Sequence, residues 1–168
     1  EIIIYLCGMK VTFSEFRENA ETHGICEMSK DWDKCKSKIQ LVDLALSIRG
    51  IEYLAKAIAE GWGIDPITIA EQFEPFNYGR YTRDKDGYTS AMYCCGNMNP
   101  VTEIYVEQAA LLIVDFIGKI YVPKNQICEV HAVNSKFYVY GDGVLSLKSY
   151  GNVEIYNEAD TPAKIERI

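Results

Sequence analysis

The chain contains only two histidines among its 168 residues, His23 and His131, and this scarcity limits the catalytic sites that it can build. A nucleophilic triad needs a base beside its nucleophile, and histidine is the usual base. His131 falls in an alternating pattern in which it shares a strand face with Glu129, whereas Cys128 points to the opposite face. Cys128 and His131 therefore make a poor catalytic pair. The sequence predicts no catalytic residues and favours a protein that is not an enzyme.

Positive charge is also scarce, with 17 Lys and Arg residues against 24 Asp and Glu residues, a net charge of −7. Proteins that bind a phosphate backbone or an anionic membrane do so through clustered Lys and Arg. A glycine-rich phosphate-binding loop of the Walker or Rossmann spacing is missing as well. We therefore expect no nucleic-acid partner, no membrane partner and no cofactor.

The chain lacks a long hydrophobic run. Its apolar opening, residues 1–8 (EIIIYLCG), is far shorter than the roughly twenty residues that span a bilayer. It also lacks the basic segment that opens a signal peptide. Two interpretations of residues 1–8 stay open: an edge strand, or a segment that is not native and precedes a natural first residue at Met9. Neither indicates export, so we expect a cytoplasmic protein.

The six cysteines have the spacing neither of a disulfide framework nor of a complete metal site. Hydrophobic residues make up 48% of the chain, enough for a core without disulfides, so we expect reduced thiols. Cys94 and Cys95 are adjacent, and on a strand one would be buried and the other exposed. His23, Cys26 and Cys35 are ligands of the kind that zinc prefers. No fourth ligand completes the set, so we expect no metal, with the cysteines as small buried residues and His23 at a helix end.

What the sequence does contain is a repeat: pairs of apolar residues recur about every eight positions through its last third. The pairs are Ile104/Val106, Leu112/Val114, Ile120/Val122, Phe137/Val139, Leu145/Leu147 and Val153/Ile155. Alternation with a period of two indicates short strands, and turn signals such as Gly141-Asp142-Gly143 separate them.

Two topologies fit this repeat, an antiparallel meander and a β-solenoid. In a three-sided coil each turn would hold about 24 residues, because each side takes about eight. Leu112 would then stack on Phe137, and Glu129 would come near Glu154. Apolar residues recur well at that interval. We therefore predict an α+β protein whose strands form a small β-helix or solenoid, with the antiparallel meander as the alternative.

The first half has the residue spacing of short helices. We expect helices at residues 12–24, 38–49, 51–61 and 65–73, a break at Arg49-Gly50 and a connecting loop at residues 25–37. The chain then divides into an apolar segment (1–8), a helical region (9–76), a junction (77–100), a β-repeat region (101–160) and a C-terminal tail (161–168). The helices pack on the coil or cap one end. The other end, near Ile165 and Ile168, is open to self-association, which predicts a homo-oligomer.

The junction is the strongest candidate for a binding site. It combines arginine, which makes bidentate contacts to carboxylate or phosphate, with tyrosine, which supplies rigid contact area. The predicted binding residues are Tyr78, Arg80, Tyr81, Arg83 and Tyr88. We expect them to contact a protein or a small anionic ligand. The alternative is a solvated loop whose tyrosines cover the joint between the two halves.

Three short segments carry a resemblance to known proteins: Ala59–Ile64 (AEGWGI), Gly79–Tyr81 (GRY) and Gly87–Ser90 (GYTS). Followed by the repetitive strands, they resemble small uncharacterised proteins of gut Bacteroidales and their phages. The resemblance covers most of residues 10–160. It implies a phage-associated setting, and it carries no activity to any residue.

Together these patterns favour a non-enzymatic binding protein that contacts its partner through the 78–88 loop or the tyrosine-rich coil. One alternative is a carbohydrate-binding or carbohydrate-active β-helix that uses Tyr138, Tyr140, Glu129 and Glu154. A second alternative is a structural module stabilised by a metal at His23, Cys26 and Cys35.

Overall fold

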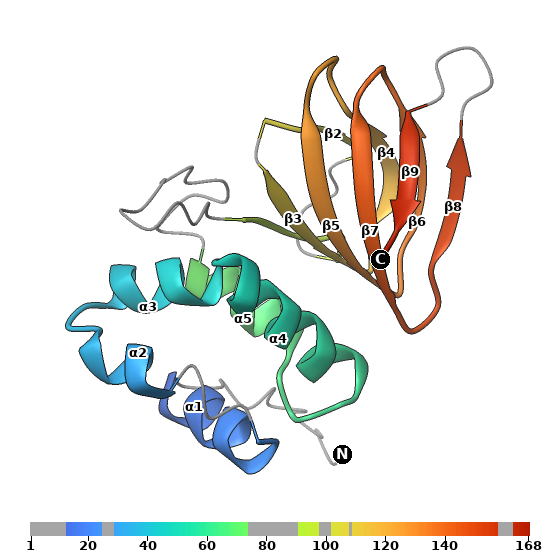
Figure 1. The fold of residues 1–168 in the computed structure, drawn as a ribbon. Helices are drawn as coiled ribbons and strands as arrows, with labels where there is room; N and C mark the ends of the chain where they lie inside the picture. The colour runs from blue at the N-terminus through green and yellow to red at the C-terminus, as the bar shows by residue number, and fades with distance from the viewer. Residues whose placement is uncertain (1–12, 25–28, 74–90, 98–101, 108, 158–162) are drawn as a thin grey trace, which may run out of the picture.

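The computed structural model describes residues 13–24, 29–73, 91–97, 102–107, 109–157 and 163–168, in which short helices precede short strands (Figure 1). The helices are α1 (Phe13–Thr22), α2 (Ser29–Lys34), α3 (Lys38–Ala45), α4 (Ile48–Ala59) and α5 (Pro66–Phe73). The strands are β1 (Met92–Cys95), β2 (Glu103–Tyr105), β3 (Ala110–Val114), β4 (Ile117–Tyr121), β5 (Ile127–Val133), β6 (Lys136–Tyr140), β7 (Val144–Tyr150), β8 (Glu154–Asn157) and β9 (Lys164–Arg167). None of the described helices is long and apolar enough to cross a membrane.

Polar side chains determine where three of the helices begin. The Gly50 N–H donates to Ser47 Oγ over 3.1 Å at the start of α4, and Ser37 has the same role for α3. Asp65 accepts backbone N–H groups at the start of α5, where a proline occupies the first helical position as expected. These caps satisfy N–H groups that the first turn of a helix leaves without an intrahelical partner.

The expected helix break at Arg49-Gly50 is wrong, because the Ser47 cap starts α4 before these residues. Gly50 is buried inside α4, and a Cβ atom there would lie 2.3 Å from the Ala45 carbonyl oxygen. It therefore permits the close approach of α4 to the end of α3. The expected loop at residues 25–37 also contains a helix, α2.

Every strand pair of the described residues is parallel. Strands β1-β3-β5-β7-β9 form one sheet, here the odd sheet, and β2-β4-β6-β8 form the other, the even sheet. The chain alternates between the two, so each turn of the coil adds one strand to each sheet (Figure 1). This topology confirms the β-solenoid and shows that the antiparallel meander is wrong.

One turn of the coil is shorter than the length of about 24 residues expected for three sides. Ile104 lies beside Ile120 on the next turn of the even sheet. On the odd sheet Leu112 lies beside His131 and not beside Phe137. The reason for the difference is that the coil has two strand-bearing sides and tight corners.

One corner of the coil repeats a left-handed backbone conformation. Asp115, Asn134 and Gly151 have φ angles of 50°, 46° and 68°, and each follows a strand of the odd sheet. Asp, Asn and Gly are the residues that adopt positive φ most readily. The Asn152 N–H donates to Asn134 Oδ1 over 3.0 Å, which links the corners of neighbouring turns.

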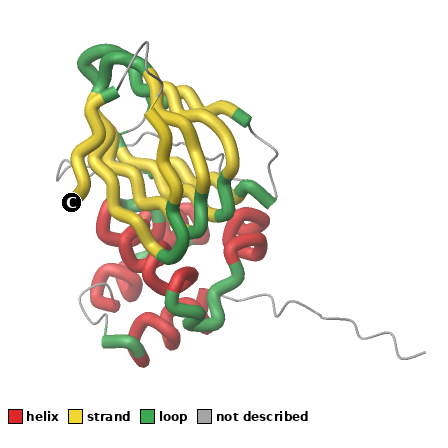
Figure 2. The backbone as a smooth tube through the Cα atoms, turned by 90° about the vertical axis from the view of Figure 1, so that its right-hand side faces the viewer, coloured by secondary structure: helices red, strands yellow, loops and turns green. Residues whose placement is uncertain are grey.

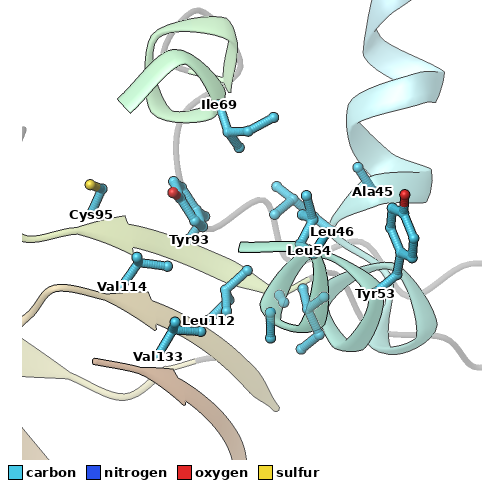
Figure 3. Close-up of a cluster of buried hydrophobic side chains, with 14 of the residues drawn as sticks. Ala45, Leu46, Tyr53, Leu54, Ile69, Tyr93, Cys95, Leu112, Val114 and Val133 are labelled. Carbon is cyan, nitrogen blue, oxygen red and sulfur yellow. The ribbon is translucent and has the colours of Figure 1, made fainter. Parts of the chain in front are cut away.

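Two hydrophobic cores lie on opposite faces of the odd sheet. All five residues of β3 are buried: Leu111 and Ile113 point into the coil, whereas Leu112 and Val114 pack against the helices together with Leu54 of α4 (Figure 3). A strand covered on both faces is apolar throughout. The pair Leu112/Val114, expected in the core of the coil, therefore belongs to the second core.

The helices lie on the outer side of the odd sheet, with α4 and α5 next to it and α1 and α2 farther away, as Figure 1 shows. Figure 2 shows the helices and the strands from a second side. Helix α4 contacts β3, β5 and β7, and α5 contacts β1. The described helices thus pack on the side of the coil, one of the two arrangements expected. Strand β1 lies within the junction, residues 77–100, and β9 lies within the C-terminal tail, residues 161–168.

We expect Phe137→Ala to lower the free energy of unfolding by about 3–5 kcal/mol, because the ring is fully buried inside the coil and its removal leaves a cavity. The matched control is Tyr138→Ala on the neighbouring, solvent-facing position, which should cost less than about 1 kcal/mol. Urea unfolding curves measure both changes. Equal losses in the two variants would contradict the assigned facing of β6.

Candidate functional site

The predicted binding residues Tyr78, Arg80, Tyr81, Arg83 and Tyr88 lie outside the described residues. The structure therefore does not test them, and the junction site stays a prediction.

The three metal candidates divide between described and undescribed parts of the chain. Cys26 lies outside the described residues. The His23 ring stacks on Trp62 with centroids 3.9 Å apart, and its Nδ1 lies 2.8 Å from the Asn19 carbonyl oxygen. The Cys35 thiol donates to the Asp31 carbonyl oxygen, and burial raises the pKa of that thiol. In the described ranges, no three His, Cys, Asp or Glu side chains are grouped as metal ligands would be.

The adjacent cysteines of β1 are both buried, so the expectation that one is exposed is wrong. Cys94 points into the coil and Cys95 toward the helices, because both faces of β1 are covered. Burial raises the pKa of Cys94 to about 11 and that of Cys128, also inside the coil, to about 12. Both thiols therefore stay protonated at neutral pH, and the protonated form is a poor nucleophile.

A fully buried polar side chain, His131 on β5, lies between the odd sheet and α4. Its side chain has 0% exposure, and its Nε2 lies 2.6 Å from Glu129 Oε1. Its Nδ1 lies 3.2 Å from the Tyr150 hydroxyl of β7. Since a carboxylate only accepts, Nε2 carries the proton and donates to Glu129, which leaves Nδ1 to accept from Tyr150. The predicted shared face of His131 and Glu129 is confirmed.

The charged side chains of Lys148 and Glu52 connect the surroundings of this histidine to α4. Lys148 Nζ lies 3.4 Å from Glu52 Oε2 on α4 and 4.0 Å from Glu129 Oε1. Burial is the main cause that lowers the pKa of His131 below 6.5 and raises the pKa of Tyr150 to about 12. The imidazole is therefore neutral near pH 7. Both ring nitrogens are bonded and the His131 side chain is fully buried, so the imidazole itself is closed to a substrate. The ion pair between Lys148 and Glu52 joins the odd sheet to α4.

The outer face of the even sheet is distinguished by its tyrosines. We call this surface the tyrosine face; its residues are Glu103, Tyr105, Ile117, Lys119, Tyr121, Lys136, Tyr138, Tyr140, Glu154 and Tyr156. They alternate along each strand with residues that fill the coil, so all of them point away from it.

Parallel register aligns these tyrosines in two rows across the strands. In the first row Tyr105, Tyr121 and Tyr140 lie side by side on β2, β4 and β6, with ring centroids 5.1 Å apart at each step. In the second row Tyr138 stacks on Tyr156, again at 5.1 Å. Tyr105 is 61% exposed and Tyr138 43%, so both rows reach solvent.

The charges of the tyrosine face balance, although the whole chain is acidic. Lys136 Nζ lies 2.9 Å from Glu154 Oε2 and 5.3 Å from the centre of the Tyr156 ring. Lys119 Nζ lies 5.8 Å from the centre of the Tyr140 ring. Hydrogen bonds from Lys136 and Tyr156 lower the pKa of Glu154. Lysines and glutamates in equal number thus frame a neutral aromatic surface.

The expected pair of carboxylates at Glu129 and Glu154 is wrong. Glu129 lies on the odd sheet beside Ser146, whereas Glu154 lies on the even sheet beside Lys136. The two residues fall on different sides of the coil because one turn is shorter than expected. Tyr138 and Tyr140, named with them, do lie on one solvent-facing strand.

The sequence contains a signal for the tyrosine face that was not recognised as a repeat. Tyr121 and Tyr140 have the same separation in the sequence as the corner residues Asp115 and Asn134. Tyrosines on the strands and turn-forming residues at the corner thus recur together, which is the signature of one turn. With a turn taken as about 24 residues, these tyrosines were not aligned.

No protein-family model matches the chain, no curated protein is similar to it, and no solved structure matches it. What the chain does is therefore inferred from its own geometry.

We expect the stability of the protein to fall as the pH is lowered from about 7 to about 5, and His131 to contribute to that fall. Well above pH 6.5 the imidazole is neutral in both the folded and the unfolded chain, so it adds no pH dependence there. Below pH 6.5 the unfolded chain binds the proton first, because the folded pKa is lowered, and the folded state becomes less stable.

The variant His131→Gln keeps a hydrogen-bond donor and cannot titrate. Its free energy of unfolding, measured by urea denaturation at each pH, should fall less steeply than that of the wild type over this range. A constant difference between the two proteins from pH 7 to pH 5 would show that the folded pKa of His131 is not lowered.

Proposed function

We propose that this chain is a non-enzymatic binding protein that recognises a protein partner through its tyrosine face. The observation that carries the proposal is the pair of solvent-facing tyrosine rows on one side of the coil. Tyrosine and arginine are the residue types enriched at energetically dominant positions of protein interfaces. A ring that is amphipathic and has few rotatable bonds buries much area at a low entropic cost.

The backbone of the even sheet supports this role because it holds the rings in place before binding. Each tyrosine of a row lies on a strand that is hydrogen-bonded to the neighbouring strands. The residues that precede these tyrosines along their strands, Ile104, Ile120 and Val139, are buried in the coil. Contacts between neighbouring rings restrict them further. Binding then requires little additional ordering, which otherwise costs affinity.

The packing of the rings against one another favours a protein over a carbohydrate. Sugars pack their C–H faces on open aromatic faces, but in these rows each ring contacts a neighbour at 5.1 Å, tilted by 50° and 56° in the first row and stacked at 29° in the second. Tyrosine combines an aromatic ring with a hydroxyl group, which suits the mixed apolar and hydrogen-bonding contacts of a protein interface. A neutral carbohydrate is the alternative ligand, and Tyr105 at the end of its row is the ring most open to it.

The chemistry of the buried groups supports a role in binding without catalysis. The described thiols at Cys94 and Cys128 are protonated, and His131 is closed off from solvent. The junction residues Arg80, Tyr81 and Arg83 remain a proposed second contact region, and a phage-associated setting remains a proposed context.

The test is affinity capture from a lysate of cells that carry the protein, followed by mass spectrometry and by measurement of Kd for the captured partner. The triple variant Tyr105→Ser/Tyr121→Ser/Tyr140→Ser should weaken binding at least about 30-fold, the effect of losing a strong interface position. The matched control is Ile127→Ser, which removes an exposed apolar side chain from the odd sheet and should leave Kd unchanged.

A second arm locates the site. If Arg80→Ala/Tyr81→Ala/Arg83→Ala abolishes binding while the tyrosine variant binds normally, the junction is the interface and the proposal for the tyrosine face fails. Binding of a neutral polysaccharide that the tyrosine variant loses, with no protein captured, would establish the carbohydrate alternative.

A further inference from the structure

The last strand of the odd sheet leaves one side of its backbone unpaired within the described part of the chain. Strand β9 pairs with β7 on one side, where the N–H groups of Lys164 and Ile168 donate to Gly143 and Leu147. In a parallel strand, alternate residues direct both their N–H and their C=O to the same side. Ile165 and Arg167 therefore direct theirs to the outer edge, where they can pair with another strand.

Within the described residues, the interior of the coil is also incompletely covered at this end. Ile155 of β8 and Ile165 of β9 are only partly buried against the inner core. Strands β8 and β9 end the even and the odd sheet, respectively, on the side away from β1 (Figure 1). An apolar end with an open backbone edge is a surface that another strand-bearing chain can extend.

We propose that a second copy of this chain covers this end, with the two β9 strands pairing antiparallel about a two-fold axis at Ile165. In this register the Ile165 residues of the two copies exchange their N–H···O=C bonds, which agrees with the direction of their backbone groups. Lys164 of each copy then lies directly opposite Glu166 of the other, in the closer, non-hydrogen-bonded type of pair.

Charge selects this register over its neighbours. An axis at Glu166 would place glutamate opposite glutamate, and an axis at Arg167 would place arginine opposite arginine. Like charges directly opposite on neighbouring strands are destabilising. Lys164 and Glu166 are already ion-paired within one copy, so their side chains lie together on the outer face of β9.

Charge also favours a closed dimer over a head-to-tail chain of copies. In a head-to-tail arrangement β9 would meet β1, whose sequence MYCC offers no charge to match Lys164 or Glu166. The two-fold arrangement matches both charges and buries the same apolar residues from each copy, so it closes at two subunits.

Charge-swapped variants and sedimentation measurements test the dimer. Wild type should sediment at twice the 19.1 kDa mass of the single chain. Lys164→Glu alone or Glu166→Lys alone should raise the dissociation constant about tenfold or more, because each single change places two like-charge pairs across the interface. Unfolding midpoints of the isolated variants check that the coil itself is retained.

Mixing the two single variants separates the interface from the ion pair within one copy. In a mixed dimer the two acidic side chains of one copy lie opposite the two basic side chains of the other, so dimers should form again although each copy still carries a like-charge pair. Monomeric wild type, particles larger than a dimer, or a dimer that neither single variant weakens would each overturn the proposal.

Discussion

The rest of the structure depends on the parallel hydrogen bonding between successive turns of the coil. Every strand of a sheet pairs with the strand one turn earlier, so Ile120 lies between Ile104 and Val139. Residues at equivalent positions of successive turns therefore lie side by side. Apolar residues line the inside, Asp, Asn and Gly residues with positive φ angles form one corner, and tyrosines lie on the even sheet. A solenoid of this kind obtains its stability from neighbouring turns, and a single turn would not be stable alone.

The two sheets of the coil have different surroundings, and this difference organises the surface of the protein. Helices α4 and α5 cover the odd sheet, where His131, Glu129 and Lys148 connect it to Glu52. The buried imidazole is bonded at both nitrogens to residues of the odd sheet itself, Glu129 and Tyr150, and its burial favours the neutral form. The even sheet has no described helix on its outer face, so its tyrosines stand in solvent (Figure 1). The covered sheet packs against the helices in a second hydrophobic core, and the open sheet presents its tyrosines to solvent.

Strand and core positions were predictable from local pattern, because alternation reports which residues a strand buries whatever its partner. Phe137, Val139 and Leu145 all point inward as expected. The length of one turn was not predictable in this way, since it depends on how tightly the corners close. The corner at Asn134 closes in a left-handed conformation. Because the expected turn was too long, the neighbours expected for Glu129 were wrong and the rows of tyrosine were not recognised.

The sequence by itself determined that short helices precede a series of short strands that form a β-solenoid. The helix cap at Asp65 and strand alternation are local, so nearby residues suffice to specify them. Only the tertiary structure decided that both faces of β3 are covered, that both thiols of β1 are buried, and that the tyrosines share one open face. These outcomes depend on contacts between residues distant in sequence, whose partners are set by the register of the coil and by the packing of α4.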